Sequence, residues 1–523
     1  MPFKIEINDL SSVGCVRDVE ASQLPPEAWS FAENMRFSEL GVERMNGREQ
    51  VFGTPGVAPH FAMPIATSTQ TYWLYVSLLK AFVYDGTTHT NITRTAGGDY
   101  AANATKDWNG TVFGGVPILN NGVDVPQYWS TLSPATPLAA LANWPATART
   151  RVIRAFGPYL VAMDITKSGT RFPHMFKWSH PADPGTIPSS WDETDPTKDA
   201  GESDLPDVSA GTILDGLPLQ GNFYVYKEGS IWRVSHIGGS FIFDFKVLLQ
   251  TAGILAPRCV ALTGDGTRHV VATQDDILVH NGQSVDSILD KRYKRFYVNN
   301  VDVANYTNSF MFTNPFRDEV WFCFPEVGQT NPTRALIWNY KEGQRGAISE
   351  APIAFRNATG GTVETADADT WATTTETWET TIGPWSQSNR QSVVACAPEV
   401  TKFLELDKGS LDNGATMLGT LQRTALSFIG RKRTGEWIVD YAVRKLIRRV
   451  WIKASGGPIN VRVGFQEIVD GPITWGSAVV FNPETALWVD AVGSGKAVAV
   501  EFSAAVPFRI IGYKIEGEVV GQY

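Results

Sequence analysis

The sequence predicts an all-β protein, in which an irregular β-propeller of about six blades is followed by a C-terminal β-sandwich-like domain. Two observations support this prediction. The 523 residues include 47 Gly, 30 Pro and 17 Trp but only 8 Met, a composition that favours strands and tight turns over long helices. Apolar and polar residues also alternate along most of the chain, in runs separated by Gly, Asn and Asp. This period of two is typical of strands with one buried face.

A recurring unit predicts the blades. Between residues 60 and 350, an apolar strand, a turn with glycine and a second short strand recur, with the turn glycines at Gly86, Gly122, Gly169, Gly229, Gly282 and Gly343. Propeller repeats have roughly 40–50 residues, and closing small sheets into a ring buries faces that no single sheet can cover. The alternative is a set of unrelated hairpins in two or three β-sandwiches.

Three segments follow from these patterns. We expect residues 1–58 to form N-terminal strands and an extension that helps to close the propeller, and residues 59–413 to form the propeller. Insertions are expected at about 180–211, which is acidic, and at about 359–389, which is rich in Thr and Trp. Residues 414–523 form the sandwich-like domain, because apolar and polar residues alternate in stretches such as RIIGYKIEG at 509–517.

Charge is unevenly distributed between these segments. The chain has a net charge of −9; residues 1–413 carry 32 Lys/Arg and 45 Asp/Glu, whereas residues 414–523 carry 13 Lys/Arg and 9 Asp/Glu. The main body is therefore acidic and the C-terminal end mildly basic. This balance argues against a general nucleic-acid binder that is held by phosphate neutralisation.

Motifs for catalysis and metal binding are absent from the sequence. There is no Gly-x-Ser-x-Gly, and the nearest candidate for a phosphate-binding loop, at residues 493–496, lacks the first glycine and the final Ser/Thr. The seven histidines include no pair with metal-ligand spacing, and the four cysteines are far apart. We therefore expect buried thiols, no enzymatic activity, no cofactor and no metal site. No run of about 18 apolar residues predicts a membrane span.

Several parts of the chain resemble one family of viral proteins. The run LPPEAWSFAENMRFSELGVERMNGREQVFG resembles the start of tail nozzle (tail tubular) proteins from short-tailed, podovirus-like bacteriophages, and the matching positions are Pro26, Ala28, Asn34, Arg36, Gly41, Arg44 and Gly47. Residues 108–129 and 215–257 and the ending AVAVEFSAAVPFRIIGYKIEGEVVGQY are similar to the same family. The likeness is scattered over most of the chain.

The resemblance implies a virion structural protein that is made in the cytoplasm of the host bacterium. In this family a ring of identical propeller subunits, usually a homohexamer, lies below the portal and the tail adaptor and carries or contacts tail fibres or spikes. The lumen of the ring retains the double-stranded DNA genome, and then conducts it into the host during ejection without sequence-specific binding. The family has no catalytic residues to carry over.

Two groups of residues are candidates for contacts in such a ring. We hypothesise that the acidic segment lines or constricts the channel through Asp183, Asp192, Glu193, Asp195, Asp199, Glu202, Asp204 and Asp207. Contacts with another subunit or with a partner are expected from Trp371, Trp378, Trp385, Arg448, Arg449 and Lys453. The alternatives without a contact are a solvated loop for the acidic segment, a hairpin that covers its own core for the three tryptophans, and a charged strand edge for the three basic residues.

Two other functions remain open from the sequence. The first is a host-surface recognition protein whose exposed tryptophans stack on sugars. The second is a propeller glycosidase, which is the less favoured because the sequence around Asp367 and Asp369 lacks the glycine of an Asp-box and is one residue short of that motif.

Overall fold

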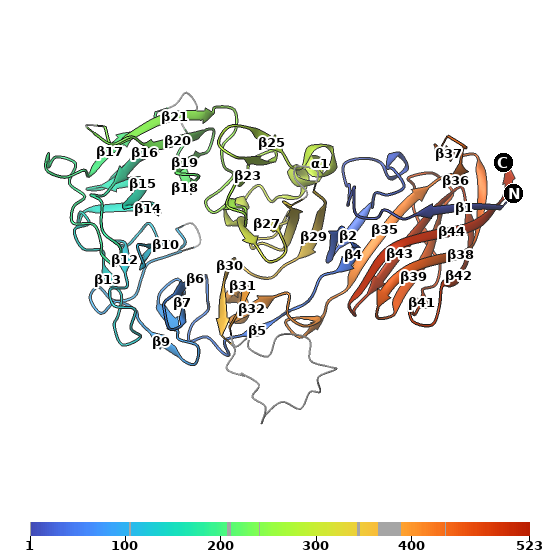
Figure 1. The fold of residues 1–523 in the computed structure, drawn as a ribbon, viewed down its shortest axis with the longest axis horizontal. Coiled ribbons are helices and arrows are strands. Elements are labelled where there is room, and N and C mark those ends of the chain that lie inside the picture. Colours follow the sequence, from blue (N-terminus) through green and yellow to red (C-terminus); the bar gives the residue numbers. More distant parts are fainter. Residues whose placement is uncertain are drawn as a thin grey trace.

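The protein folds into a propeller-shaped disc with a β-sandwich beside it (Figure 1). The computed structural model describes residues 2–103, 106–206, 211–239, 241–341, 346–364, 389–434 and 436–522. Within these ranges the chain is nearly all-β, with a single α-helix, α1 (Asp290–Asn300), and three short 3-10 turns, η1 (Ala21–Gln23), η2 (Tyr306–Asn308) and η4 (Pro398–Val400). None of the helices in the described ranges is long and apolar enough to span a membrane.

Seven four-stranded antiparallel units form the disc. Blade 1 consists of β6 (Phe61–Ala66), β7 (Thr71–Val76), β8 (Ala81–Tyr84) and β9 (His89–Asn91). Blade 2 consists of β10 (Asn109–Phe113), β11 (Val116–Asn120), β12 (Gln127–Tyr128) and β13 (Ala139–Ala140). Blade 3 consists of β14 (Ala148–Phe156), β15 (Tyr159–Lys167), β16 (Thr170–Trp178) and β17 (Gly201–Asp204). Blade 4 consists of β18 (Ile213–Leu219), β19 (Asn222–Lys227), β20 (Ile231–His236) and β21 (Phe243–Leu249).

The remaining three blades complete the circle. Blade 5 consists of β22 (Val260–Leu262), β23 (His269–Ala272), β24 (Ile277–His280) and β25 (Val285–Ser287). Blade 6 consists of β26 (Phe310–Asn314), β27 (Glu319–Phe324), β28 (Arg334–Asn339) and β29 (Ile348–Pro352). Blade 7 consists of β30 (Asn357–Glu364), β31 (Asn389–Ala397), β32 (Lys402–Leu406) and, from the N-terminal part of the chain, β5 (Arg48–Val51).

The first strand of each blade lies innermost, and the ring of first strands is closed. Each first strand contacts the first strand of the next blade, and β30 of blade 7 contacts β6 of blade 1. β5 adds to the outer edge of blade 7 by antiparallel pairing with β32, from Val51 opposite Phe403 to Arg48 opposite Leu406. The N-terminal part of the chain therefore helps to complete the ring from outside.

The β-propeller fold agrees with the sequence prediction, but the number of blades does not. Six of the seven blades contain one of the six turn glycines, and Gly86, Gly122, Gly169 and Gly282 have the positive φ that favours glycine in such turns. Gly229 is not among the positive-φ glycines, and Gly343 lies outside the described residues. The expected repeat missed blade 7 because its first two strands flank residues 365–388 and its fourth strand comes from the other end of the sequence.

The sandwich consists of two sheets. One sheet has the order β3 (Met35–Ser38), β4 (Gly41–Arg44), β44 (Phe508–Gln522), β38 (Val443–Gly456) and β42 (Trp488–Gly495), and β1 (Pro2–Ile7) also pairs with β44. The other contains β2 (Phe31–Glu33), β35 (Gly419–Leu426), β43 (Ala497–Ala504), β39 (Ile459–Gln466), β40 (Thr474–Trp475) and β41 (Val479–Phe481). The hairpin of β36 (Phe428–Arg431) and β37 (Trp437–Val439) forms a separate two-stranded sheet, whereas the hairpin of β33 (Leu411–Asp412) and β34 (Ala415–Thr416) extends the sheet of blade 7, because β33 pairs in parallel with β5.

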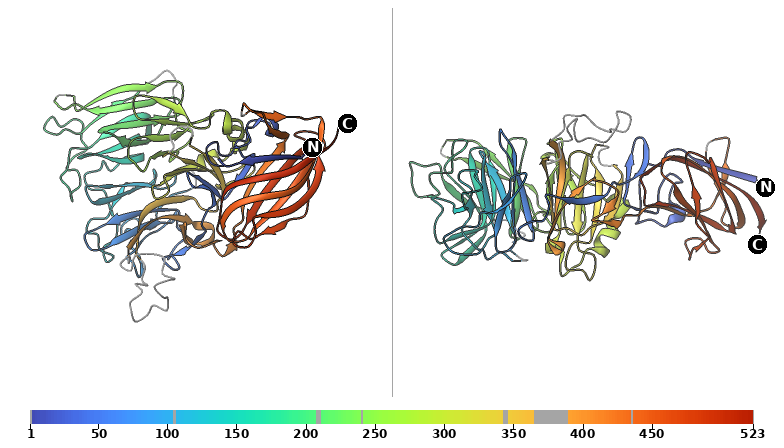
Figure 2. Two further views of the ribbon diagram at one scale, coloured as in Figure 1. Left: turned by 45° about the vertical axis from the view of Figure 1, so that its right-hand side comes forward. Right: turned by 90° about the horizontal axis from the view of Figure 1, so that it is seen from below.

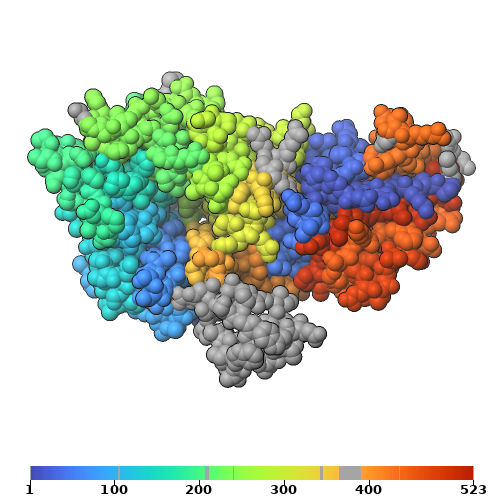
Figure 3. Space-filling model, in the orientation of Figure 1, coloured from blue at the N-terminus to red at the C-terminus, as the bar shows by residue number. Residues whose placement is uncertain are grey.

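A continuous sheet joins the two bodies. β2 pairs in parallel with β29 of blade 6, through Glu33 and Glu350, and in antiparallel with β35 of the sandwich. Blade 6 and one sheet of the sandwich thus form a single ten-stranded sheet. The N-terminal residues lie between the propeller and the C-terminal strands (Figure 3), and both termini lie at the end of the sandwich that faces away from the propeller (Figure 2).

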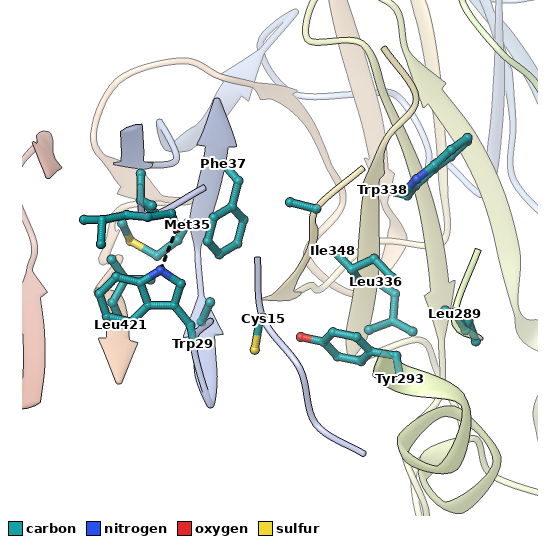
Figure 4. Packing of buried hydrophobic residues seen from close by; sticks show 14 of the residues in the cluster. Cys15, Trp29, Met35, Phe37, Leu289, Tyr293, Leu336, Trp338, Ile348 and Leu421 are labelled. Atoms are coloured by element: carbon teal, nitrogen blue, oxygen red, sulfur yellow. Dashed lines mark hydrogen bonds between the residues drawn. The ribbon is translucent and has the colours of Figure 1, made fainter. Parts of the chain in front are cut away.

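Apolar packing also crosses the junction. The largest buried cluster contains Cys15 and Trp29 from the N-terminal segment, Tyr293 from α1, Leu336 from blade 6 and Leu421 from the sandwich (Figure 4). Burial on this scale stabilises each large side chain by roughly 1.5–3 kcal/mol, so the two bodies share a core and do not hang on a flexible linker.

A buried ion network lies at the same junction. Nε of Arg36, on β3, is 2.6 Å from Glu319 of blade 6, and the same guanidinium also bonds Asp407, which follows β32. Both carboxylates raise the pKa of Arg36, although its burial acts in the opposite direction. In blade 6, Glu350 is fully buried, with Nε of Arg17 at 3.2 Å and Nη1 of Arg334 at 3.1 Å.

The N-terminal strands also change the charge balance. Residues 1–47 carry four Lys/Arg and eight Asp/Glu, so their net charge of −4 cancels the +4 of residues 414–523 once they fold together. Two of the ion pairs between them are Lys4 with Glu516, at 3.4 Å, and Arg509 with Glu43, at 2.5 Å. The sandwich body is therefore neutral overall, and the propeller carries the net negative charge.

Candidate functional site

The best-formed cavity opens near the axis of the propeller. Its volume is about 270 Å³, and it lies on the face where the first strands begin. Residues from five consecutive blades line it: the starts of β10, β14 and β18, the segments before β22 and β26, and the adjoining ends of β15 and β16. The cavity therefore lies where the first strands of several blades converge.

The lining is cationic although the protein is acidic. It contains six basic side chains and three acidic ones, namely Lys106, Arg149, Arg151, Arg154, Arg171 and Arg258 against Asp107, Asp164 and Asp215. Each aspartate pairs with one arginine: Arg154 with Asp215 at 2.7 Å, Arg171 with Asp164 at 2.6 Å and Arg258 with Asp107 at 3.3 Å. The other three basic side chains face no carboxylate partner among the described residues.

Asp215 organises the inner wall of the cavity. Its side chain is almost fully buried and accepts hydrogen bonds from the backbone N–H groups of Gly216, at 2.8 Å, and Arg258, at 3.0 Å. With the Arg154 guanidinium, these donors occupy both carboxylate oxygens. Asp215 is thereby a positioning group that holds Arg154 and the Arg258 backbone in place.

The Arg258 side chain is only partly satisfied. Its Nη1 is buried and has no hydrogen-bond partner among the described residues, while Nη2 makes the longest of the three ion pairs in the cavity. The guanidinium also lies 5.9 Å from the ring centre of Phe310. A buried donor without an acceptor costs about 1–3 kcal/mol, and more for a charged group.

Two lining residues have an unusual backbone conformation. Arg258 has φ +65° and Asp164 has φ +54°, in the left-handed region that residues other than glycine adopt at a cost. At Asp164, where the pairing of β15 with β16 shifts register, this conformation places the carboxylate for its two bonds to Arg171, at 2.6 and 2.8 Å. Two charged residues of the lining thus have a backbone conformation that is costly for residues other than glycine.

The predicted acidic segment lies elsewhere, at the outer edge of blade 3. It connects the third strand, β16, with the outermost strand, β17. Asp183, Asp192, Asp199 and Asp204 are exposed. Asp192 and Asp195 accept hydrogen bonds within their own turns, from Thr194 and Thr197, and Asp207 lies outside the described residues.

The two glutamates of this segment are paired. Glu193 and Glu202 both contact Lys167 and Lys177, with Lys167 3.2 Å from Glu193 and Lys177 3.2 Å from Glu202. Partial burial raises the pKa of Glu193, but the hydrogen bond and the charge of Lys177, together with the hydrogen bond from Lys167, outweigh this effect and the pKa is lowered to about 2. Trp191, fully buried against Trp144 at 4.7 Å between ring centres, anchors the segment.

The predicted contact residues of the C-terminal domain lie on the outward face of β38. Arg448 pairs with Glu518 at 2.6 Å and Arg449 with Asp490 at 2.9 Å, so each has a partner on a neighbouring strand. Lys453 is also exposed. Trp371, Trp378 and Trp385 lie outside the described residues.

The same face carries an aromatic pair that the sequence analysis did not single out. Trp451 of β38 and Trp488 of β42 are opposite each other, with ring centres 4.7 Å apart. Arg449 lies over the Trp488 ring at 5.2 Å, and Lys514 lies over the Trp451 ring at 4.6 Å. Trp488 is 37% exposed. The two tryptophans are far apart in sequence, and only the pairing of the strands reveals the pair.

The cationic cavity was also missed. Its residues are spread from 106 to 307 and form no local motif, because segments from five blades that are distant in sequence come together there. The single sequence signal available was the spacing of Arg149, Arg151 and Arg154 along one strand. No group of three or more His, Cys, Asp or Glu in the described part of the chain has a geometry that would hold a metal ion. The four cysteines are buried and unpaired.

Comparisons with known proteins give likeness in structure alone. Neither a family model nor a curated protein matches the sequence. The chain is similar to the WD40 β-propeller domain of Doa1, with 9% identity and a TM-score of 0.34 over 70% of this chain and 96% of that one. It is also similar to PorZ, a surface component of the type-IX secretion system of Porphyromonas gingivalis, with 9% identity and a TM-score of 0.35. That match covers 71% of this chain and 42% of PorZ. Such weak likeness adds nothing on function.

Proposed function

We propose that this chain is a structural subunit of a bacteriophage short tail, which forms the nozzle that retains the double-stranded DNA genome and then conducts it into the host. Within this proposal the chain is not an enzyme, and its partners are further copies of itself, the tail adaptor, and tail fibres or spikes. The working form is a ring, with six copies as the expected number.

One observation carries the proposal. Four of the seven residues that match the nozzle family near the N-terminus lie where the propeller meets the sandwich. Arg36 makes the buried ion pairs with blade 6, the Asn34 side chain donates to the carbonyl of Leu418 at 2.9 Å, and Arg44 donates to the carbonyl of Met417. A Cβ at Gly47 would lie 2.2 Å from the carbonyl oxygen of Leu411. The resemblance therefore includes residues that make contacts at this junction.

Two further features support a rigid conduit. A shared core and a continuous sheet make the subunit stiff at the junction, which suits a ring that must resist the pressure of packaged DNA. The propeller carries the net negative charge of the chain, with 28 Lys/Arg and 37 Asp/Glu in residues 48–413. Acidic walls repel DNA and allow it to slide, whereas basic walls would hold it by counterion release.

The carboxylates in the axial cavity also favour a structural role over catalysis. A glycosidase needs two carboxyl groups, one that donates a proton and one that acts as nucleophile or base. Here Asp107, Asp164 and Asp215 are each paired with an arginine, so no carboxylate among the described lining residues is unpaired.

Electron microscopy of the purified chain, alone and with its tail adaptor, tests the proposal. We expect closed rings of about six copies with a central opening, and native mass spectrometry should give the same number. Monomers in both conditions would contradict it.

A second experiment tests the channel hypothesis. The seven described carboxylates of the acidic segment are replaced by amides, which should slow genome release. The matched control replaces exposed carboxylates of the sandwich, such as Glu467 and Asp490, in the same way. Equal release from both variants would exclude this segment as the channel lining.

A second function has one specific observation in its favour. The partly exposed rings of Trp451 and Trp488, which are tilted by 45° to each other, are aromatic surface of the kind on which sugar rings stack, and Arg449 and Lys514 lie over them. Under this alternative the sandwich recognises a host-surface glycan. A glycan array would then show binding that Trp488→Ala abolishes and that Trp191→Phe, a change in the propeller core, leaves intact. Absence of binding by the wild-type chain would remove the alternative.

A further inference from the structure

We propose that the axial cavity of the propeller binds the oxyanion group of a small ligand, either a phosphate or a carboxylate. Arg258 and Arg151 are the residues that receive it, and Arg149 and Lys106 add positive charge at the rim. This site is separate from ring assembly and from DNA conduction, so it stands or falls independently of the nozzle.

The charge of the lining is the first reason. Six basic side chains face three acidic ones in a space of about 270 Å³. Because this cavity lies within an acidic protein, its positive potential is local and is not produced by the net charge. Clefts lined by one sign of charge concentrate ions of the opposite sign.

The unsatisfied guanidinium is the second reason. Nη1 of Arg258 is buried without an acceptor among the described residues, and the ion pair of Nη2 with Asp107 is long, at 3.3 Å. An arginine fork matches the two oxygens of a carboxylate or a phosphate. An oxyanion would therefore supply the missing acceptor after a small rotation of the side chain.

The availability of Arg151 is the third reason. Its side chain lines the cavity and is partly exposed, with no ion pair to a described carboxylate. Its backbone carbonyl is fixed by Asn109, at 2.8 Å, and by Asn120, at 3.1 Å. The backbone is thus anchored while the guanidinium stays available to a ligand.

The backbone conformation of Arg258 is a fourth reason. Its φ of +65° is costly for arginine, and such conformations persist where the surroundings fix them and gather at ligand sites. Here the bond from the Arg258 N–H to Asp215 and the bond from the Met311 N–H to the Arg258 carbonyl, at 2.7 Å, fix it. The side chain is thereby directed into the cavity in advance of binding.

The cavity also limits the ligand. Pockets for drug-sized molecules have about 300–1,000 Å³, so 270 Å³ admits a single sugar-sized group. A phosphorylated or carboxylated monosaccharide meets the requirements of size and charge. A nucleic-acid strand is too large for the space and is not expected to enter it.

Isothermal titration calorimetry of the full chain at low ionic strength tests the site. Inorganic phosphate and glucuronate are titrated separately, with chloride as the reference anion. We expect saturable binding of one or both. Binding of phosphate alone identifies a phosphate-bearing ligand, and binding of glucuronate alone identifies a carboxylate-bearing one. Equal heats for all three anions, or no saturable binding by either oxyanion, would overturn the proposal.

Matched arginine variants decide which residues receive the anion. Arg151→Gln should weaken binding at least about tenfold, which corresponds to one charge-assisted hydrogen bond. Arg448→Gln, on the outer face of the sandwich, should leave binding unchanged. Arg258→Gln removes the partner of Asp107, so the melting temperature of this variant is measured before its affinity. If Arg258→Gln is unfolded, the conclusion rests on Arg151→Gln alone. Unchanged affinity in Arg151→Gln would show that the anion does not bind in this cavity.

Discussion

Replacing Arg36 should uncouple the N-terminal strands from the propeller. The Arg36 side chain is 8% exposed and lies between Glu319, at 5%, and Asp407, at 18%. In Arg36→Met these two carboxylates lose their shared cation, and Arg317, 3.7 Å from Asp407 and 40% exposed, can compensate only in part. Removing one partner of a buried pair costs about 3–5 kcal/mol, because the other charge stays buried.

Hydrogen–deuterium exchange measures this loss locally. Exchange is followed at individual amides, so the readout does not depend on whether the whole chain unfolds in a single step. The amides of β3 and β4 exchange by local opening, and a loss of about 3–5 kcal/mol should speed their exchange by roughly 10²- to 10³-fold or more. Amides of blade 3, on the far side of the disc, should keep the wild-type rate.

Two controls test the reasoning. Arg444→Met breaks an exposed pair with Glu467, whose side chains are 40% and 59% exposed, and exposed pairs contribute about 0.2–1 kcal/mol. The triple variant Arg36→Met, Glu319→Gln, Asp407→Asn removes all the charges together and should recover most of the protection. The amide oxygen introduced by Glu319→Gln can still accept the hydrogen bond from the Trp321 indole N–H. If the amides of β3 and β4 exchanged as slowly in Arg36→Met as in Arg444→Met, the buried network would not hold the junction.

Two further predictions concern the propeller alone. The Tyr226 hydroxyl lies between Nδ1 of His269, at 2.6 Å, and Nε2 of His280, at 2.8 Å, and burial lowers the pKa of these histidines to about 3 and about 4. Between pH 6.5 and pH 4 the unfolded chain therefore binds more protons than the folded one, so the melting temperature should fall on acidification, with on the order of 3 kcal/mol from His280 alone. His280→Gln should flatten this dependence and the partly exposed His60→Gln should not; identical slopes in all three proteins would contradict it. Closure of the ring is tested by neighbouring glycines of β30: a Cβ at Gly361 would lie 2.7 Å from Cβ of Pro64 in blade 1, whereas at Gly360 the nearest atom is 3.9 Å away. Gly361→Ala should lower stability by about 1–3 kcal/mol, with Gly360→Ala neutral in the same thermal melt, and equal melting temperatures would mean that blades 7 and 1 are not tightly packed there.

Local patterns in the sequence were enough for the fold class. Strand period and turn glycines are properties of a few adjacent residues, so the blades around Gly86, Gly122, Gly169 and Gly282 could be recognised one at a time. The buried cysteines and the alternation at 509–517 follow from the same local rules, with Tyr513 and Ile515 buried and Lys514 turned outward.

Only the tertiary structure decided the features that depend on contacts between strands distant in the chain. The seventh blade requires β5 to meet β32 from the other end of the propeller sequence, and the sandwich requires β1, β3 and β4 to join strands from the C-terminal end. The neutral charge of the sandwich, the Trp451–Trp488 pair and the cationic cavity arise in the same way. Sequence periodicity fixes which face of a strand is buried, because that is a local property of the backbone. It does not fix which strand lies next to it, since that depends on how the whole chain closes.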